Sequence, residues 1–128
     1  MKTLLALLTL TFGLSSHAAW NELECEGRIP GGKDVRIEVE QPFPYGSYFK
    51  RANLTLADEG SEKTYNFTVS TRVILSRVEY IAAGLKVDVS FWPDQKPRWG
   101  RIYQGTMMAG ILENQYIQHL NCRFPNAQ

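Results

Sequence analysis

Hydrophobic and polar residues alternate with a period of two along most of the chain, which is typical of strands buried on one face. The clearest stretch is 34–40, where Val35, Ile37 and Val39 face one way and mainly charged residues face the other. The same alternation predicts five further strands, which cover 22–28, 52–57, 63–70, 85–92 and 116–124. A sixth strand is predicted at 101–108, where the alternation is less regular. Short segments rich in turn-forming residues separate several of them. The pattern therefore predicts an all-β protein.

The first two predicted strands also have a predictable register. If Arg28 lies opposite Asp34, then Glu26 lies opposite Arg36 and both pairs attract. A shift of two residues in either direction places like charges opposite each other. Cross-strand pairs contribute roughly 0.2–1 kcal/mol each, so we expect the first register. It places Cys25 on the core face.

Residues 71–83 fit two interpretations. Ile74, Val78, Ile81 and Leu85 match the spacing of a helix as well as that of strands. We favour a strand, because several of these residues are β-branched and the neighbouring segments are predicted strands. One helix at 71–83 is the alternative.

The first 18 residues have the features of a signal peptide. Lys2 precedes an apolar run over 4–10, and Ser16, His17 and Ala18 provide a cleavage site. We therefore expect cleavage after about Ala18 and a periplasmic or secreted location in a bacterium with an outer membrane, that is, a Gram-negative one. Residues 19–128 then form a single β domain.

The composition of 19–128 excludes several classes of protein. The chain has 14 basic and 13 acidic residues, and removal of Lys2 leaves 13 of each. This balance gives no reason to expect a nucleic-acid partner. No second stretch approaches the ~18 apolar residues of a membrane helix. The charged outer face of 34–40 also lacks the apolar band of a membrane barrel. We expect no membrane insertion, and the sequence does not indicate an oligomeric state.

Two cysteines, Cys25 and Cys122, lie in the first and last predicted strands. In an exported protein we expect them to form one disulfide. A bridge requires α-carbons within roughly 7 Å, so the terminal strands must lie close together. We therefore predict a small antiparallel meander of about eight short strands, arranged as a closed or nearly closed barrel. A two-sheet sandwich is the alternative.

Two connections combine aromatic residues with proline. The segment 92–100 contains two prolines together with Trp92, Lys96, Arg98 and Trp99, and 41–49 adds two tyrosines, Tyr45 and Tyr48. Rigid aromatic loops with arginine are typical of protein-interface hot spots, and flat rings also stack on sugars. We predict binding of a protein or glycan through these residues. The alternative is that the rings cover a small core.

Glutamates gather on the outer face of the first hairpin. In the register above Glu24 opposes Glu38, and Glu22 opposes Glu40. Opposed like charges indicate either a cation site or a site for a basic partner, or simply a solvated sheet.

The sequence predicts no catalytic residue, no metal site and no cofactor. His119, the only histidine after Ala18, shares an outward face with Asn121 and Arg123, whereas Tyr116, Leu120, Cys122 and Phe124 are predicted to face the core. We therefore expect a binding module rather than an enzyme.

Two alternative functions remain open. The first is a carrier of a small apolar ligand, although we expect side chains to fill the interior, such as Val35, Ile37, Phe67, Val87 and Phe91. The second is an enzyme inhibitor. In its size, its export and Cys25-Glu26-Gly27 the chain resembles the periplasmic lysozyme-inhibitor barrels, but it lacks their Ser-Gly-x-Arg-Tyr type inhibitory loop.

Overall fold

The computed structural model describes residues 20–29, 32–41, 49–113 and 115–127. These residues form eight antiparallel strands that pair in sequence order and close into one barrel. Their bounds are β1 Trp20–Arg28, β2 Asp34–Gln41, β3 Phe49–Asp58, β4 Ser61–Ile74, β5 Arg77–Ala82, β6 Leu85–Ser90, β7 Tyr103–Ala109 and β8 Gln115–Arg123. A 3₁₀ turn, η1 Gly110–Leu112, precedes β8. The predicted fold class is confirmed.

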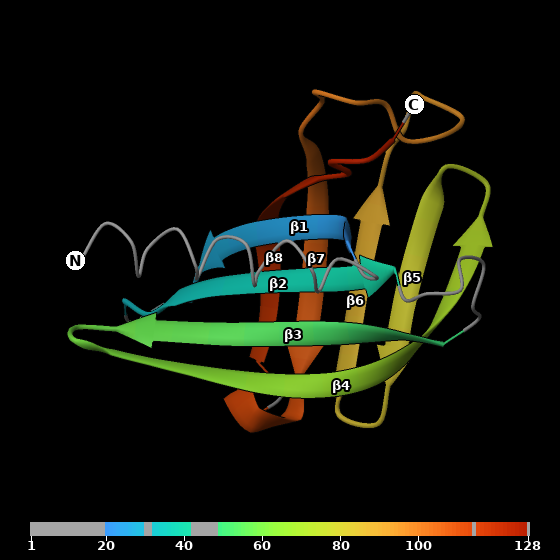
Figure 1. The fold of residues 1–128 in the computed structure, drawn as a ribbon. Coiled ribbons are helices and arrows are strands. Elements are labelled where there is room, and N and C mark those ends of the chain that lie inside the picture. Colours follow the sequence, from blue (N-terminus) through green and yellow to red (C-terminus); the bar gives the residue numbers. More distant parts are fainter. Residues whose placement is uncertain (1–19, 30–31, 42–48, 114, 128) are drawn as a thin grey trace, which may run out of the picture.

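The barrel consists of two sets of strands that cross at a steep angle. The strands β1 to β3 run across the view of Figure 1, whereas β5 to β8 stand upright behind them. The long β4 bends from one set to the other. Its first part, Ser61–Ser70, pairs with β3, and its last part, Ser70–Ile74, pairs with β5.

Residues 71–83 are the end of β4, a tight turn and β5, so the helix alternative is wrong. Val73 pairs with Val78 and Ile74 pairs with Arg77, which leaves Leu75 and Ser76 at the tip of the hairpin. The β-branched residues follow the strand pairing, and the helical spacing of the apolar residues has no structural counterpart.

The ring closes between β1 and β8, where Cys25 and Cys122 are direct cross-strand partners. Their disulfide is present, and the α-carbons lie 4.0 Å apart. The disulfide therefore joins two strands that also pair through their backbones. This arrangement confirms the predicted bridge and the closed barrel, and it excludes the sandwich alternative.

The register predicted for the first hairpin is confirmed over most of its length. Arg28 pairs with Asp34, and Glu26 pairs with Arg36. A β-bulge between Asn21 and Leu23 then interrupts the pairing, so that Asn21, and not Glu22, lies opposite Glu40. The predicted pairing of Glu22 with Glu40 is wrong, because a bulge adds a residue to one strand.

A second irregularity lies in the pairing of β7 with β8. Gly105 pairs with Leu120, but Met107 pairs with Ile117. The alternation of β8 shifts by one residue at this bulge, so Ile117 is buried and Tyr116 is 53% exposed. The prediction that Tyr116 faces the core is therefore wrong, and that for Leu120, Cys122 and Phe124 is confirmed.

Side chains fill the middle of the barrel. The largest fully buried ones are Tyr80, Phe91, Leu23, Ile37, Leu54, Met107 and Leu120. Of the residues predicted to fill the interior, all are buried except Phe67, which is half-buried against the core.

Candidate functional site

The connection between β6 and β7, residues 91–102, is built around one largely buried carboxylate, that of Asp94. The Tyr103 hydroxyl donates to Asp94 Oδ2 at 2.8 Å, and the Arg98 backbone N–H donates to the same hydroxyl at 2.9 Å. Arg101 adds an ion pair with Asp94 at 3.4 Å. The Asp94 side chain is only 12% exposed. The loop therefore has a polar frame that fixes its backbone.

This frame rests on the barrel core. The Tyr103 ring packs edge-on against Phe91 and Phe124, with ring centres 6.3 and 6.0 Å apart. Burial, and then the hydrogen bond to Asp94, raises the pKa of Tyr103. The hydroxyl thus stays protonated and donates to Asp94 across the ordinary pH range.

The two tryptophans of this loop point into solvent. Trp92 is 76% exposed and Trp99 is 72% exposed. They do not cover the core, so the alternative interpretation of these rings is wrong. Lys96 and Arg98 are also exposed on the same loop. Four of the residues predicted to bind are thus presented together on a fixed loop, while Tyr45 and Tyr48 lie outside the described residues.

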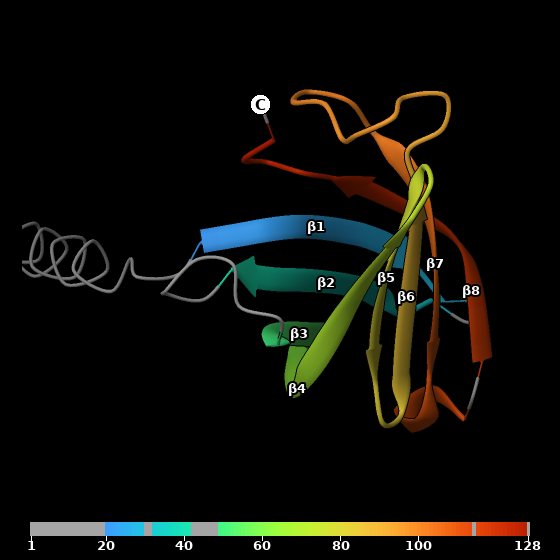
Figure 2. The same cartoon turned by 90° about the vertical axis from the view of Figure 1, so that its right-hand side faces the viewer.

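A second exposed apolar element lies beside the loop. The tip of the β4–β5 hairpin carries Val73, 66% exposed, and Leu75, 91% exposed. The Phe91 N–H donates to the Ser76 carbonyl at 2.8 Å, which ties the start of the loop to this tip. Figures 1 and 2 both show the hairpin tip and the loop side by side at one end of the barrel. Grouped exposed apolar side chains of this kind mark interaction sites.

An apolar pocket opens between the hairpin, the loop and the C-terminal segment. Its volume is about 420 Å³. Its apolar walls comprise Val73, Val78, Phe91, Pro97, Phe124 and Ala127. Gln95, Lys96 and Asn126 are exposed residues that also line it. The loop predicted to bind therefore forms one side of a real concavity.

A partly buried polar cluster also lines this pocket. Lys50 Nζ lies 2.5 Å from Glu22 Oε1, and the Tyr80 hydroxyl donates to Glu22 Oε2 at 2.6 Å. Burial, and then the charge of Glu22, raises the pKa of Tyr80 well above its ordinary value. The sequence did not reveal this cluster. It depends on the bulge in β1, and nothing in the alternation of 22–28 indicates that bulge.

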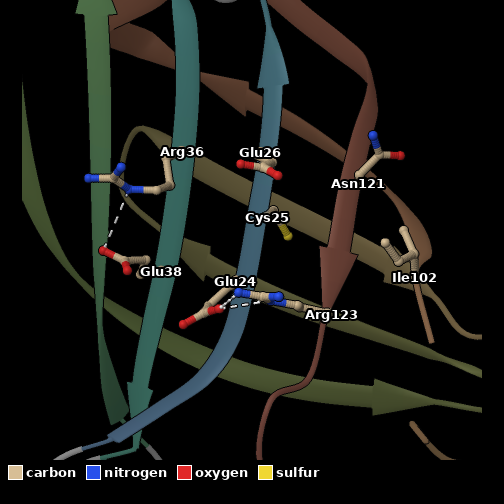
Figure 3. Close-up of a pocket in the computed structure, with 8 residues that line it drawn as sticks. All are labelled: Glu24, Cys25, Glu26, Arg36, Glu38, Ile102, Asn121 and Arg123. Carbon is tan, nitrogen blue, oxygen red and sulfur yellow. Dashed lines mark hydrogen bonds and ion pairs between the residues drawn. The ribbon is translucent and has the colours of Figure 1, made fainter. Parts of the chain in front are cut away.

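The acidic face is a separate, smaller groove on the outside of β1. Figure 3 shows Glu24 on β1, the strand that lies between β2 and β8, and the neighbouring Cys25 is buried. The groove has a volume of about 310 Å³. Arg123 Nη2 lies 2.8 Å from Glu24, and Arg36 Nε lies 3.9 Å from Glu38. Glu24 therefore has a cationic partner on the neighbouring strand β8, and Glu38 has one on its own strand.

Asparagine amides also donate hydrogen bonds to the carboxylates of this face. The Asn21 amide donates to Glu24 at 2.8 Å and to Glu38 at 3.2 Å, and it thereby bridges two opposed carboxylates. Its hydrogen bond is the main cause of the lowered pKa of Glu24, and Arg123 adds to it. Glu40 accepts from Asn53 at 2.5 Å. Of the four glutamates predicted to form the acidic face, Glu24 and Glu38 line this groove together. Glu40 does not line it, and Glu22 lines the apolar pocket instead.

We also examined His119, potential metal-binding groups and potential membrane-spanning helices. His119 is exposed on the outer face, as predicted. Within the described ranges, no three His, Cys, Asp or Glu side chains group so that they would hold a metal ion. A search of those ranges for a helix of sufficient length and apolar character to cross a membrane found none.

Comparison of the chain with protein-family models, with curated proteins and with solved structures gives no match.

Proposed function

We propose that this protein is an exported, non-catalytic binding module that holds a protein partner at the end of the barrel formed by the 91–102 loop and the β4–β5 hairpin. The observation that carries the proposal is the exposure of Trp92 and Trp99, 76% and 72%, on a loop whose backbone Asp94 and Tyr103 fix. The disulfide is compatible with an extracellular location.

Two features favour a protein partner. Tryptophan and arginine are the residues most enriched at interface hot spots, and this end presents Trp92, Trp99 and Arg98 together. A loop that is already fixed loses little conformational entropy on binding, which increases affinity. An enzyme inhibitor would be a special case, in which the partner is an enzyme.

Capture from an extract of the source organism's cell envelope tests the proposal. We expect the wild-type chain to retain a partner that the Trp92→Ala/Trp99→Ala double variant loses. Tyr116→Ala is the matched control, because Tyr116 is a 53% exposed aromatic residue that pairs with Met108, near the end of β7 away from this loop. Urea unfolding of all three proteins checks that the fold is intact.

Two outcomes would contradict the proposal. In the first, the double variant and Tyr116→Ala retain the same partners as the wild type. In the second, the double variant loses binding to a glycan array while protein capture is unchanged, which would assign the tryptophans to a sugar.

The carrier function is a second candidate, and the pocket of about 420 Å³ favours it. Ligand pockets usually measure ~300–1,000 Å³, so this pocket would hold a small molecule. The ligand would lie at the end of the barrel, because side chains fill the centre.

A further inference from the structure

We infer that the apolar pocket binds a small amphipathic anion, with its apolar body against the pocket walls and its anionic head at Lys96. The inference rests on the second candidate function, and it goes beyond that function by stating the charge and the orientation of the ligand. Its test uses purified protein and does not require a protein partner of the tryptophan loop.

The walls of the pocket favour a ligand with an apolar body. Val78 and Phe91 are buried, and Phe124 extends the same surface from the end of β8. Pro97 of the loop also lines the pocket. Removal of an apolar chain from water by such a surface stabilises the complex by about 25 cal/mol per Å² buried.

The charges around the pocket select an anionic head. The Glu22 carboxylate already accepts from Lys50 and Tyr80, so the charges of Glu22 and Lys50 in this partly buried cluster compensate each other. Lys96 lines the pocket, and within the described part of the chain no ion pair involves its ammonium group.

The rest of the loop adds to the positive potential. Arg98 and Arg101 share the single carboxylate of Asp94, so the segment from 92 to 101 carries three basic residues and one acidic residue. A ligand with a cationic head would meet this excess and be repelled, whereas a carboxylate or sulfonate would be attracted.

Isothermal titration of the full domain with decanoate and with decylammonium tests the inference, because the two probes share a chain and differ in charge. We expect saturable binding of decanoate below its micelle concentration, and binding of decylammonium weaker by about fivefold or more. Equal affinity for the two probes, or no binding of decanoate, would overturn the inference.

Variants locate the site. Lys96→Glu should weaken decanoate and strengthen decylammonium, while Lys33→Glu, in the exposed turn between β1 and β2, should change neither. Val73→Trp should block the mouth and abolish binding of both probes, whereas Leu75→Trp on the same hairpin should not, since Leu75 does not line the pocket. Decanoate binding that survives both Lys96→Glu and Val73→Trp would show that the anion binds elsewhere.

These tests are distinct from the partner test. The Trp92→Ala/Trp99→Ala variant retains the pocket walls, so it should bind decanoate like the wild type. If decanoate does not bind, the proposed protein partner is therefore unaffected. If no partner is captured, the proposed anion site is likewise unaffected.

Discussion

Gly105 is the position where the disulfide leaves no room for a side chain. A β-carbon built there would lie 2.6 Å from Cys122 Sγ and 3.2 Å from the Asp88 carbonyl oxygen. The sulfur is bonded to Cys25 and the carbonyl belongs to β6, so neither atom moves away easily. The requirement for glycine here is steric.

Gly105→Ala should therefore destabilise the barrel by about 1–3 kcal/mol, the usual effect of overpacking a closely packed site. Urea unfolding measures the change. Gln104→Ala, at the exposed neighbouring position, is the control and should stay within about 0.5 kcal/mol of the wild type. A Gly105→Ala variant as stable as that control would show that the disulfide shifts to accept a methyl group.

Asp88 should make stability depend on pH. It lies opposite Glu79 across β5 and β6. Burial raises its pKa above the ordinary value of 3.8, and the charge of Glu79 adds to the shift against the opposing effect of Lys86. The folded chain therefore holds this proton at pH values where the unfolded chain has released it. The contribution to stability is present below pH 3.8 and is lost as the pH rises through the folded pKa.

Asp88→Asn removes that titration. The stability of the variant relative to the wild type should increase as the pH rises from about 3.5 towards neutrality, as measured by urea unfolding at each pH. Thr106→Val, at the position opposite Asp88 on β7, has no titrating group and should show a constant difference. A difference for Asp88→Asn that is constant, or that grows on acidification, would contradict the assignment.

At the scale of the strands, the sequence predicted most of the fold and less of the site. Charge alone was sufficient for the register of Arg28 with Asp34, because each shifted register opposes like charges. The bulges in β1 and β8 were not predictable, since one extra residue changes which side chains face inward without changing the composition. The misplacement of Glu22 and Tyr116 has this cause.

The structure of the loop between β6 and β7 was also only partly predictable from the sequence. Its tryptophans and prolines identified it in the sequence, but the residues that hold its backbone were missed. Asp94 resembles an ordinary turn residue, and Tyr103 lies in a predicted strand of unclear alternation. Only the folded barrel brings the Tyr103 hydroxyl to Asp94 and to the Arg98 backbone.

Tyr103→Phe tests whether this hydroxyl fixes the loop. The ring would keep its contacts with Phe91 and Phe124, while Asp94 loses a donor and the Arg98 N–H loses its acceptor. Leaving such groups unpaired should destabilise the chain by about 1–3 kcal/mol. Amide hydrogen exchange should become faster at Arg98 and in its neighbours.

Exchange in β5 is the internal control for that measurement, because β5 takes no part in the loop frame and should keep its protection. If the Arg98 amide exchanges as slowly in Tyr103→Phe as in the wild type, the loop is held by its prolines and ion pairs instead. Partner capture by the variant should weaken only if the fixed backbone contributes to affinity.

At the scale of the whole molecule, closure depends on one short contact between the ends of the domain. β1 and β8 pair through only Glu24–Glu26 and Asn121–Arg123, whereas β3 and β4 pair over their whole common length. The disulfide lies in the middle of this short pairing and links residues 97 apart in the sequence. Because the β1–β8 pairing is short and the disulfide lies within it, we infer that the disulfide keeps the barrel closed.

Replacement of both cysteines by serine should therefore lower the free energy of unfolding by about 4–5 kcal/mol, the chain-entropy value for a closed loop of this length. Small domains have a free energy of unfolding of only about 5–15 kcal/mol in total, so the double variant should be close to unfolding at 37 °C.

Urea unfolding of the variant, and of the wild type with and without reductant, measures the effect. The reduced wild type should resemble the variant. Alkylation of native, non-reduced protein should modify neither sulfur. If both sulfurs react, or if the variant loses less than about 1 kcal/mol, backbone pairing and packing alone close the barrel, and the covalent link is not what holds its ends together.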